Sequence, residues 1–74
     1  MSSFEARQVM REQLRSVTAS LIAEFAGDVP AGAVIRCVAR ARDELLRSGV
    51  DTGLPAAAEA MARLKLRTLV APHV

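Results

Sequence analysis

The sequence predicts an all-α fold, a three-helix bundle with a long first helix, in a single domain that spans residues 1–74. In three segments, apolar residues recur every three or four positions, which is the spacing of one face of an α-helix. Two short segments with glycine and proline, GDVPAG at 27–32 and GVDTGLP at 49–55, separate these segments. No segment shows the alternation of apolar and polar residues that is typical of a β-strand. We therefore expect helices over about 3–26, 30–48 and 55–70, with successive helices as antiparallel or steeply crossed neighbours.

The first helix is expected to begin after Ser2. Ser2 and Glu5 have the S-x-x-E spacing of a capping box, which satisfies free backbone N–H groups at a helix start. Gly27 supplies the left-handed residue that commonly follows a helix end. The apolar face of this helix is expected to carry Met10, Leu14, Val17, Leu21, Ile22 and Phe25.

The second helix is expected to follow a turn in which Asp28 caps the backbone and Pro30 stands in the first helical turn, where its missing N–H costs nothing. Gly49 is expected to end it. Its inner face is predicted to carry Val34, Cys37, Val38, Ala41 and Leu45, widened by Ile35 and Leu46. On the charged side, formed by Arg36, Arg40, Asp43, Glu44 and Arg47, the spacing of four predicts the ion pairs Arg40–Glu44 and Asp43–Arg47.

The third helix is expected to start near Pro55, with Asp51 or Thr52 as its cap, and to stop before Pro72. Leu66 and Val70 are then expected to point away from the bundle, on the side of Glu59, where a further partner covers them or they are simply exposed. The inner face of this helix is predicted to carry Leu54, Ala57, Ala58, Met61, Leu64 and Leu69.

The composition predicts a thin core without covalent or metal support. Hydrophobic residues make up 51% of the chain, but it has no Trp, no Tyr and only two Phe. A single core in a chain this short rarely supplies more than about 3 to 5 kcal/mol, and disulfides, metals or self-association usually add to it. Cys37 is the only cysteine, which excludes an internal disulfide and a Cys-rich zinc site. We expect it to be a small buried apolar residue, and the alternative is a reactive or intermolecular thiol. Self-association is the support that is left.

No catalytic site is predicted. The only histidine, His73, follows Pro72 near the end of the sequence, where we expect a frayed tail. The Ser and Thr residues lack a neighbouring base or a nucleophile-elbow motif, and the glycine turns lack a phosphate-binding motif. We expect no enzymatic activity, no cofactor and no metal. No signal peptide or long apolar run is found, so we expect a cytoplasmic protein without membrane contact.

The first helix carries most of the predicted interaction surface. It is expected to be longer than its two neighbours, so its N-terminal turns overhang the bundle, and the alternative for this overhang is a frayed helix end. The aliphatic parts of the arginines there are expected to pack over apolar surface while their guanidinium groups pair with carboxylates, as at helix-to-helix interfaces. We expect a homodimer or a helical protein partner. The candidate interface comprises Phe4, Arg7, Met10, Arg11, Leu14, Leu66 and Val70.

A small DNA-binding protein is the alternative interpretation. Arg7, Arg11 and Arg15 stand four apart and form a basic stripe that could track phosphates. The third helix offers Arg63, Lys65 and Arg67 in a possible helix-turn-helix arrangement. Eight carboxylates are interspersed among the ten cations, which leaves a formal charge of only +2 and little long-range attraction for nucleic acid.

The order of the segments LIAEFAGDVP, VIRCVARARDELLRSGV and GLPAAAEAMARLKL resembles the actinobacterial three-helix bundle dimerisation domain. That domain occurs alone and at the N-terminus of arsenate reductase and low-molecular-weight protein tyrosine phosphatase-like proteins. The resemblance covers about residues 21–66 and lies in packing and turn positions. It implies a dimerising or docking module, or an accessory subunit of a phosphatase-like or arsenate-reducing enzyme. No catalytic role follows from it, because the arginines after Cys37 do not have the C-x5-R spacing of the phosphatase loop.

Overall fold

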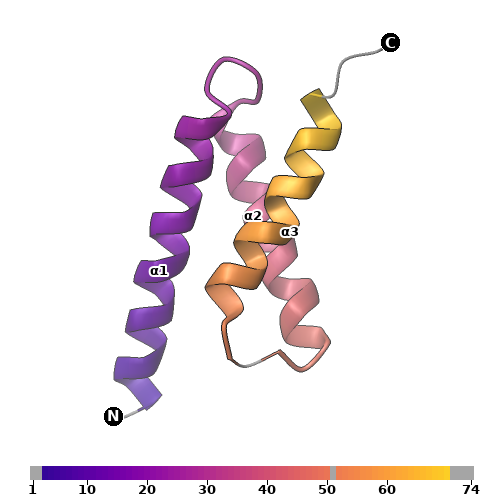
Figure 1. The fold of residues 1–74 in the computed structure, drawn as a ribbon. Helices are drawn as coiled ribbons and strands as arrows, with labels where there is room; N and C mark the ends of the chain where they lie inside the picture. Colours follow the sequence, from indigo (N-terminus) through magenta and orange to yellow (C-terminus); the bar gives the residue numbers. More distant parts are fainter. Residues whose placement is uncertain (1–2, 51, 71–74) are drawn as a thin grey trace.

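The structure is a computed structural model that describes residues 3–50 and 52–70. These residues form three helices, α1 (Ser3–Glu24), α2 (Ala31–Arg47) and α3 (Leu54–Val70), and no strand. Figure 1 shows α1 and α3 running in the same direction and α2 in the opposite one. The predicted all-α three-helix bundle with a long first helix is confirmed, and each helix end lies within two residues of its expected position.

The turn between α1 and α2 is closed by backbone hydrogen bonds. The N–H groups of Asp28 and Val29 both donate to the carbonyl oxygen of Phe25, at 3.0 Å. Gly27 has a φ of +91°, as predicted for the left-handed residue after a helix. Pro30 is the N-cap residue of α2, in an extended conformation, and no side chain caps this end. The prediction that Asp28 caps α2 is therefore wrong, because the helix begins one residue after Pro30 and not within reach of Asp28.

The end of α2 is a Schellman motif. Val50 N–H donates to Leu45 O at 3.0 Å, and Gly49 N–H donates to Leu46 O at 3.1 Å. Gly49 has a φ of +87°, which confirms its predicted place after the helix. The predictions for the caps at Ser2 and Asp51, for Pro72 and for His73 fall outside the described residues.

One hydrophobic cluster fills the space between the three helices. Leu21 and Phe25 enter it from α1 and the following turn, and the second helix contributes Val34, Val38 and Ala41. Leu14, Val17 and Ile22 pack against this cluster while half-buried, as do Cys37 and Leu45 of α2. These predicted inner-face positions are confirmed. The predicted widening of the second face is wrong, because Ile35 and Leu46 are 52% and 50% exposed, and Met10 is half-buried without joining the cluster.

The predicted inner face of α3 is wrong in part. Its fully buried residues are Leu54, Ala58, Ala62 and Leu66, whereas Leu64 and Leu69 are 66% and 69% exposed. A row of residues spaced by four turns around the helix by about 40° at each step, so it contacts neighbours that cross the helix obliquely. Figure 1 shows α3 crossing α2 in this way. Helix α3 therefore packs on its neighbours through the row that contains Ala58 and Ala62, and not through the face that carries Leu64 and Leu69.

Ion pairs join α3 to both of its neighbours. Arg63 Nη2 lies 3.0 Å from Glu24 Oε1 of α1, and Lys65 Nζ lies 3.2 Å from Glu44 Oε1 of α2. The predicted pairs within α2 are wrong. The Glu44 carboxylate contacts α3 instead of Arg40, the Asp43 carboxylate pairs with Arg42, and Arg47 Nε donates to the backbone oxygen of Asp43.

Candidate interaction surface

The N-terminal turns of α1 are little buried by the rest of the bundle. Every residue from 3 to 9 is exposed, Met10 is the first half-buried one, and Leu21 is the only fully buried residue of the helix. A helix packed along its whole length would bury about one residue in every three or four. The helix has 22 residues against 17 in each neighbour, so its first turns extend past them. The predicted overhang is present.

The overall dimensions agree with an incompletely packed bundle. The radius of gyration is 13.1 Å, whereas roughly 11 Å is typical of a compact chain of this length. Among residues 3–50 and 52–70, no side chain larger than leucine is fully buried, and the one larger core side chain, Phe25, is 5% exposed. Large apolar side chains remain exposed on all three helices, and on α1 these are Phe4 and Val9, at 69% and 42%.

Two adjoining hollows of about 210 Å³ each lie along α1 and α2. They share Arg11, Leu14 and Arg42, so we treat them as one feature, the α1–α2 groove. Helix α1 and helix α2 each supply one wall. The groove is lined by Arg7, Met10, Arg11, Leu14, Arg15 and Thr18 of α1 and by Ile35, Val38, Ala39 and Arg42 of α2.

The groove combines an apolar floor with a cationic rim. Its apolar side chains are half-buried or buried except at the edge, where Ile35 is 52% exposed. Four of its ten lining residues are arginines, and none of the described residues that line it is acidic. Arg42 pairs with Asp43 at 3.1 Å, but within residues 3–50 and 52–70 no ion pair is formed by Arg7, Arg11 or Arg15. Like charges spaced by four on a helix repel one another, so this rim favours an anionic neighbour.

The structure brings only part of the predicted interface together. Arg7, Met10, Arg11 and Leu14 line one hollow, and Phe4, which is 69% exposed, lies on the same unsupported half of α1. The prediction that Leu66 faces outward is wrong, because Leu66 belongs to the buried row of α3. Val70 is half-buried against the core, and it ends α3 at the opposite end of the molecule from the start of α1 (Figure 1). Leu66 and Val70 therefore do not extend the surface on α1.

Sequence reasoning missed Arg42 as a member of this surface. Arg42 was not assigned to either predicted face of the second helix. In an antiparallel pair, residues that lie equally far from the connecting turn come together, and Arg11 and Arg42 both lie about 15 residues from Gly27. This equal separation from the turn is the sequence signal from which the place of Arg42 beside Arg11 could have been predicted.

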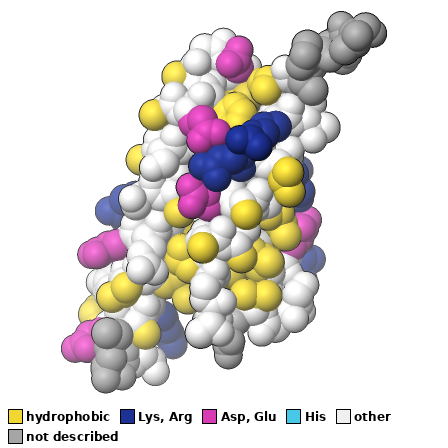
Figure 2. Space-filling view, in the orientation of Figure 1, with side chains coloured by type: hydrophobic (Ala, Val, Ile, Leu, Met, Phe, Trp, Pro, Cys, Tyr) yellow, Lys and Arg dark blue, Asp and Glu magenta, His cyan; other side chains and the backbone are white. Residues whose placement is uncertain are grey.

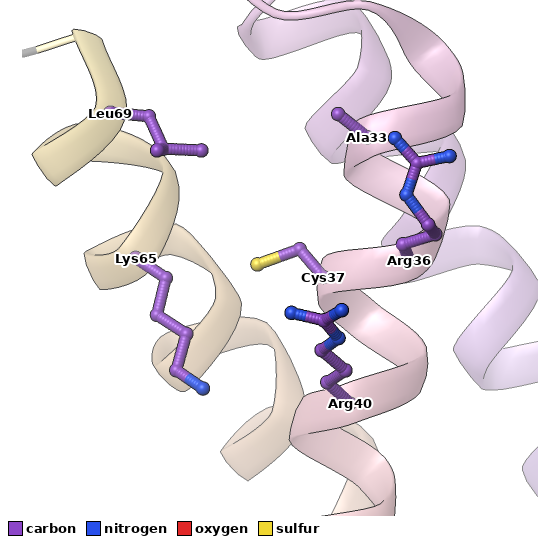
Figure 3. Close-up of a pocket in the computed structure, with 6 residues that line it drawn as sticks. All are labelled: Ala33, Arg36, Cys37, Arg40, Lys65 and Leu69. Atoms are coloured by element: carbon purple, nitrogen blue, oxygen red, sulfur yellow. The ribbon is translucent and has the colours of Figure 1, made fainter.

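A second hollow, of about 310 Å³, lies between α2 and α3 (Figure 3). In Figure 3 the Cys37 side chain extends from α2 toward α3, and its thiol donates to Ala62 O at 3.7 Å. Lys65, on the other wall, is held by Glu44. The hollow is lined by Ala33, Arg36, Cys37, Arg40, Lys65 and Leu69.

The face shared by α1 and α3 has two different halves. Figure 2 shows side chains of both charges gathered in its upper part and hydrophobic side chains gathered in its lower part. A hollow of about 370 Å³ lies there between the two helices, with Val17 on one wall and Pro55 and Ala56 on the other. Its lining includes one carboxylate, Glu59, which already contacts Arg63 at 3.0 Å. This hollow therefore lacks the uncompensated charge of the α1–α2 groove.

The described residues hold no group of three or more His, Cys, Asp or Glu side chains that could bind a metal ion. None of the helices formed by 3–50 and 52–70 is both long enough and apolar enough to cross a membrane. Comparisons with models of protein families, with curated proteins and with solved structures found no match to the chain. The resemblance to the three-helix bundle dimerisation domain therefore stays a prediction.

Proposed function

We propose that this chain is a non-catalytic protein–protein interaction module, which docks a helical partner or a second copy of itself through the N-terminal half of α1. The observation that carries the proposal is the run of exposed positions from 3 to 9 in a continuous helix. Isolated helices shorter than about 12 to 15 residues are marginal in water, so a half-helix without tertiary packing gains stability from a partner. The resemblance to a dimerisation domain supports the same role.

A cytoplasmic location belongs to this proposal. Cys37 is unpaired and half-buried, which suits a reducing compartment. A role beside a phosphatase-like or arsenate-reducing enzyme has only the resemblance behind it.

A DNA-binding role has less support than protein docking. In α3, Arg63 and Lys65 are engaged by carboxylates of the same chain, which leaves Arg67 as the one cation of the predicted trio without an ion pair among the described residues. Near the arginines of α1, the half-buried side chains of Met10 and Leu14 line the same hollow, and a phosphate backbone offers them no apolar contact.

Photo-crosslinking in cells that naturally contain the protein tests the proposal. A photoreactive phenylalanine analogue would replace Phe4 in one variant and Leu69 in a control, since both side chains are 69% exposed. We expect a discrete crosslinked protein, or a crosslinked second copy, from position 4 and none from position 69. Light scattering over a range of concentrations then separates self-association from a different partner. Equal crosslinking at both positions, or none at position 4, would overturn the proposal.

A further inference from the structure

We propose that the α1–α2 groove binds an acidic amphipathic helix of another protein, with apolar side chains on its floor and carboxylates against its arginine rim. This inference rests on the proposed docking function and names the chemistry of the partner.

The floor of the groove selects for apolar side chains. Val38, only 4% exposed, lines one of the two hollows together with the half-buried Leu14, and the half-buried Met10 lines the other. Ile35 adds an exposed apolar edge on α2. Covering these side chains removes apolar surface from water, at about 25 cal/mol for each Å² buried. A ligand that presents only charged groups would leave these apolar side chains in contact with water.

The rim of the groove selects for carboxylates on both sides of that apolar contact. Arg7, Arg11 and Arg15 follow one wall at intervals of one helical turn, and Arg42 stands on the other wall. Guanidinium groups bind carboxylates through two parallel hydrogen bonds, which a flexible ammonium group does less well. An acidic ligand thus relieves the repulsion among cations that face no acidic residue in the groove.

The shape of the groove suits a helix. From Arg7 to Thr18 the α1 wall is about 16 Å long, which equals about three helical turns. A helix laid between two neighbouring helices presents residues at i, i+3, i+4 and i+7 to such a groove. Three turns are enough for one apolar stripe with carboxylates on both flanks.

A second copy of the chain fits the rim poorly. Within residues 3–50 and 52–70, at least four carboxylates are already engaged in ion pairs with the chain's own cations. None of the described helices carries an apolar stripe flanked by several uncommitted carboxylates. The charge complementarity therefore favours a different, acidic protein. The four engaged carboxylates belong to Glu24, Asp43, Glu44 and Glu59.

Fluorescence anisotropy with designed peptides tests this inference on the full chain. The probe is an 18-residue helical peptide with leucines at i, i+3, i+4 and i+7 and glutamates on both flanks. Three controls accompany it: the same peptide with lysines for glutamates, one with serines for leucines, and a short DNA duplex. We expect the acidic leucine peptide to bind best, and the serine peptide and the duplex to bind at least about tenfold more weakly.

Charge-reversal variants locate the site. The double variant R11E/R15E is expected to bind the acidic peptide about tenfold more weakly and to gain affinity for the lysine peptide. The matched control R36E/R40E reverses two arginines with the same spacing on the α2–α3 hollow and is expected to leave binding of the acidic peptide unchanged. Circular dichroism confirms that both variants remain helical.

Several outcomes would overturn the inference: no binding of the acidic peptide, equal binding of the serine peptide, tighter binding of the duplex, or an equal loss in both double variants. Crosslinking of position 4 to a second copy without peptide binding would leave the proposed function standing and remove this inference alone. The absence of both crosslinks and peptide binding would remove both.

Discussion

Arg63 of α3 joins the C-terminal end of α1 to α3 through Glu24. Its Nη2 lies 3.0 Å from Glu24 Oε1 and also 3.0 Å from Glu59 Oε2 on its own helix, so one guanidinium holds two carboxylates. All three side chains are partly exposed, and pairs of this kind contribute modestly and are weakened by salt. The pair nevertheless ties α1 to α3 at the end where the core is formed, far from the unsupported N-terminal half.

The contribution of the Glu24–Arg63 contact to the free energy of unfolding is expected to depend on pH. Hydrogen bonding from Arg63 lowers the pKa of Glu24 below its ordinary value of 4.5, because the bond favours the ionised carboxylate. A carboxyl group with a lowered pKa in the folded state stabilises the fold above its unfolded pKa, and this contribution is lost as the pH falls through the folded value. We expect E24Q to be less stable than the unmodified chain at pH 7 and equally stable well below pH 4.5. Urea unfolding at several pH values measures this.

The matched control for that experiment is E12Q. Glu12 is exposed on α1 and takes part in no ion pair within the described residues. A pH-dependent loss in E12Q as large as that in E24Q would show that the effect comes from net charge and not from Arg63.

Leu66 and Leu69 test the observed rotation of α3. Leu66 is fully buried and Leu69 is 69% exposed. We expect L66A to lose about 2 to 5 kcal/mol of unfolding free energy, which is enough to unfold most of the protein, because a cavity forms in the core. We expect L69A to change stability by less than about 0.5 kcal/mol. Thermal unfolding followed by circular dichroism compares them. An equal loss in both would contradict the observed rotation, and a larger loss in L69A would favour the face predicted from the sequence.

Ala62 tests the close approach of α3 to α2. It is fully buried, and its carbonyl oxygen lies 3.7 Å from the Cys37 sulfur, whereas Ala60 on the same helix is exposed. We expect A62L to cost about 1 to 3 kcal/mol, because the extra methyl groups force the two helices apart. A60L adds the same side chain where there is room and is expected to be nearly neutral. Chemical denaturation measures both, and a neutral A62L would mean that α3 does not pack on this row.

Alanine substitution at Gly27 and at Gly32 is expected to change stability in opposite directions. Gly27 has a φ of +91° and open space around it, so G27A is expected to cost about 1 to 2 kcal/mol through backbone strain alone. Gly32 lies in the first turn of α2, where an added Cβ meets only the end of Arg36 at 3.8 Å. G32A is expected to stabilise the chain by up to about 1 kcal/mol, since alanine favours the helix. Melting temperatures that move in the same direction for both variants would contradict this assignment.

The elements and the faces of α1 and α2 could be predicted because their signals are local. Gly27 and Gly49 mark positions that need a left-handed backbone, and the apolar spacing in the first two helices admits one inner face. The third helix carries leucines at 54, 64, 66 and 69, which lie on several sides, so spacing alone does not fix its rotation. The rotation of α3 depends on how it packs on α1 and α2, which approach it at the small buried side chains of Ala58 and Ala62.

The candidate site was predictable only where a single helix determines it. Arg7, Met10, Arg11 and Leu14 share one side of α1 by their spacing, and the structure places them in one hollow. Arg42 joins them through the antiparallel packing of α2. Glu44 was predicted to pair within its own helix, but Lys65 of α3 competes for it at 3.2 Å.

Amide hydrogen exchange along α1 is the most direct test of the claim that its N-terminal half is a docking surface. At low micromolar concentration without a partner, we expect the amides of residues up to Met10 to exchange almost as fast as in an unfolded chain, and those near Leu21 to be protected to the level of global unfolding. On addition of the acidic helical peptide, or at high protein concentration if the chain self-associates, protection should spread to residues 7–15. Protection at residues 3–10 as strong as that at Leu21 in the dilute chain, or no gain in either condition, would contradict the claim.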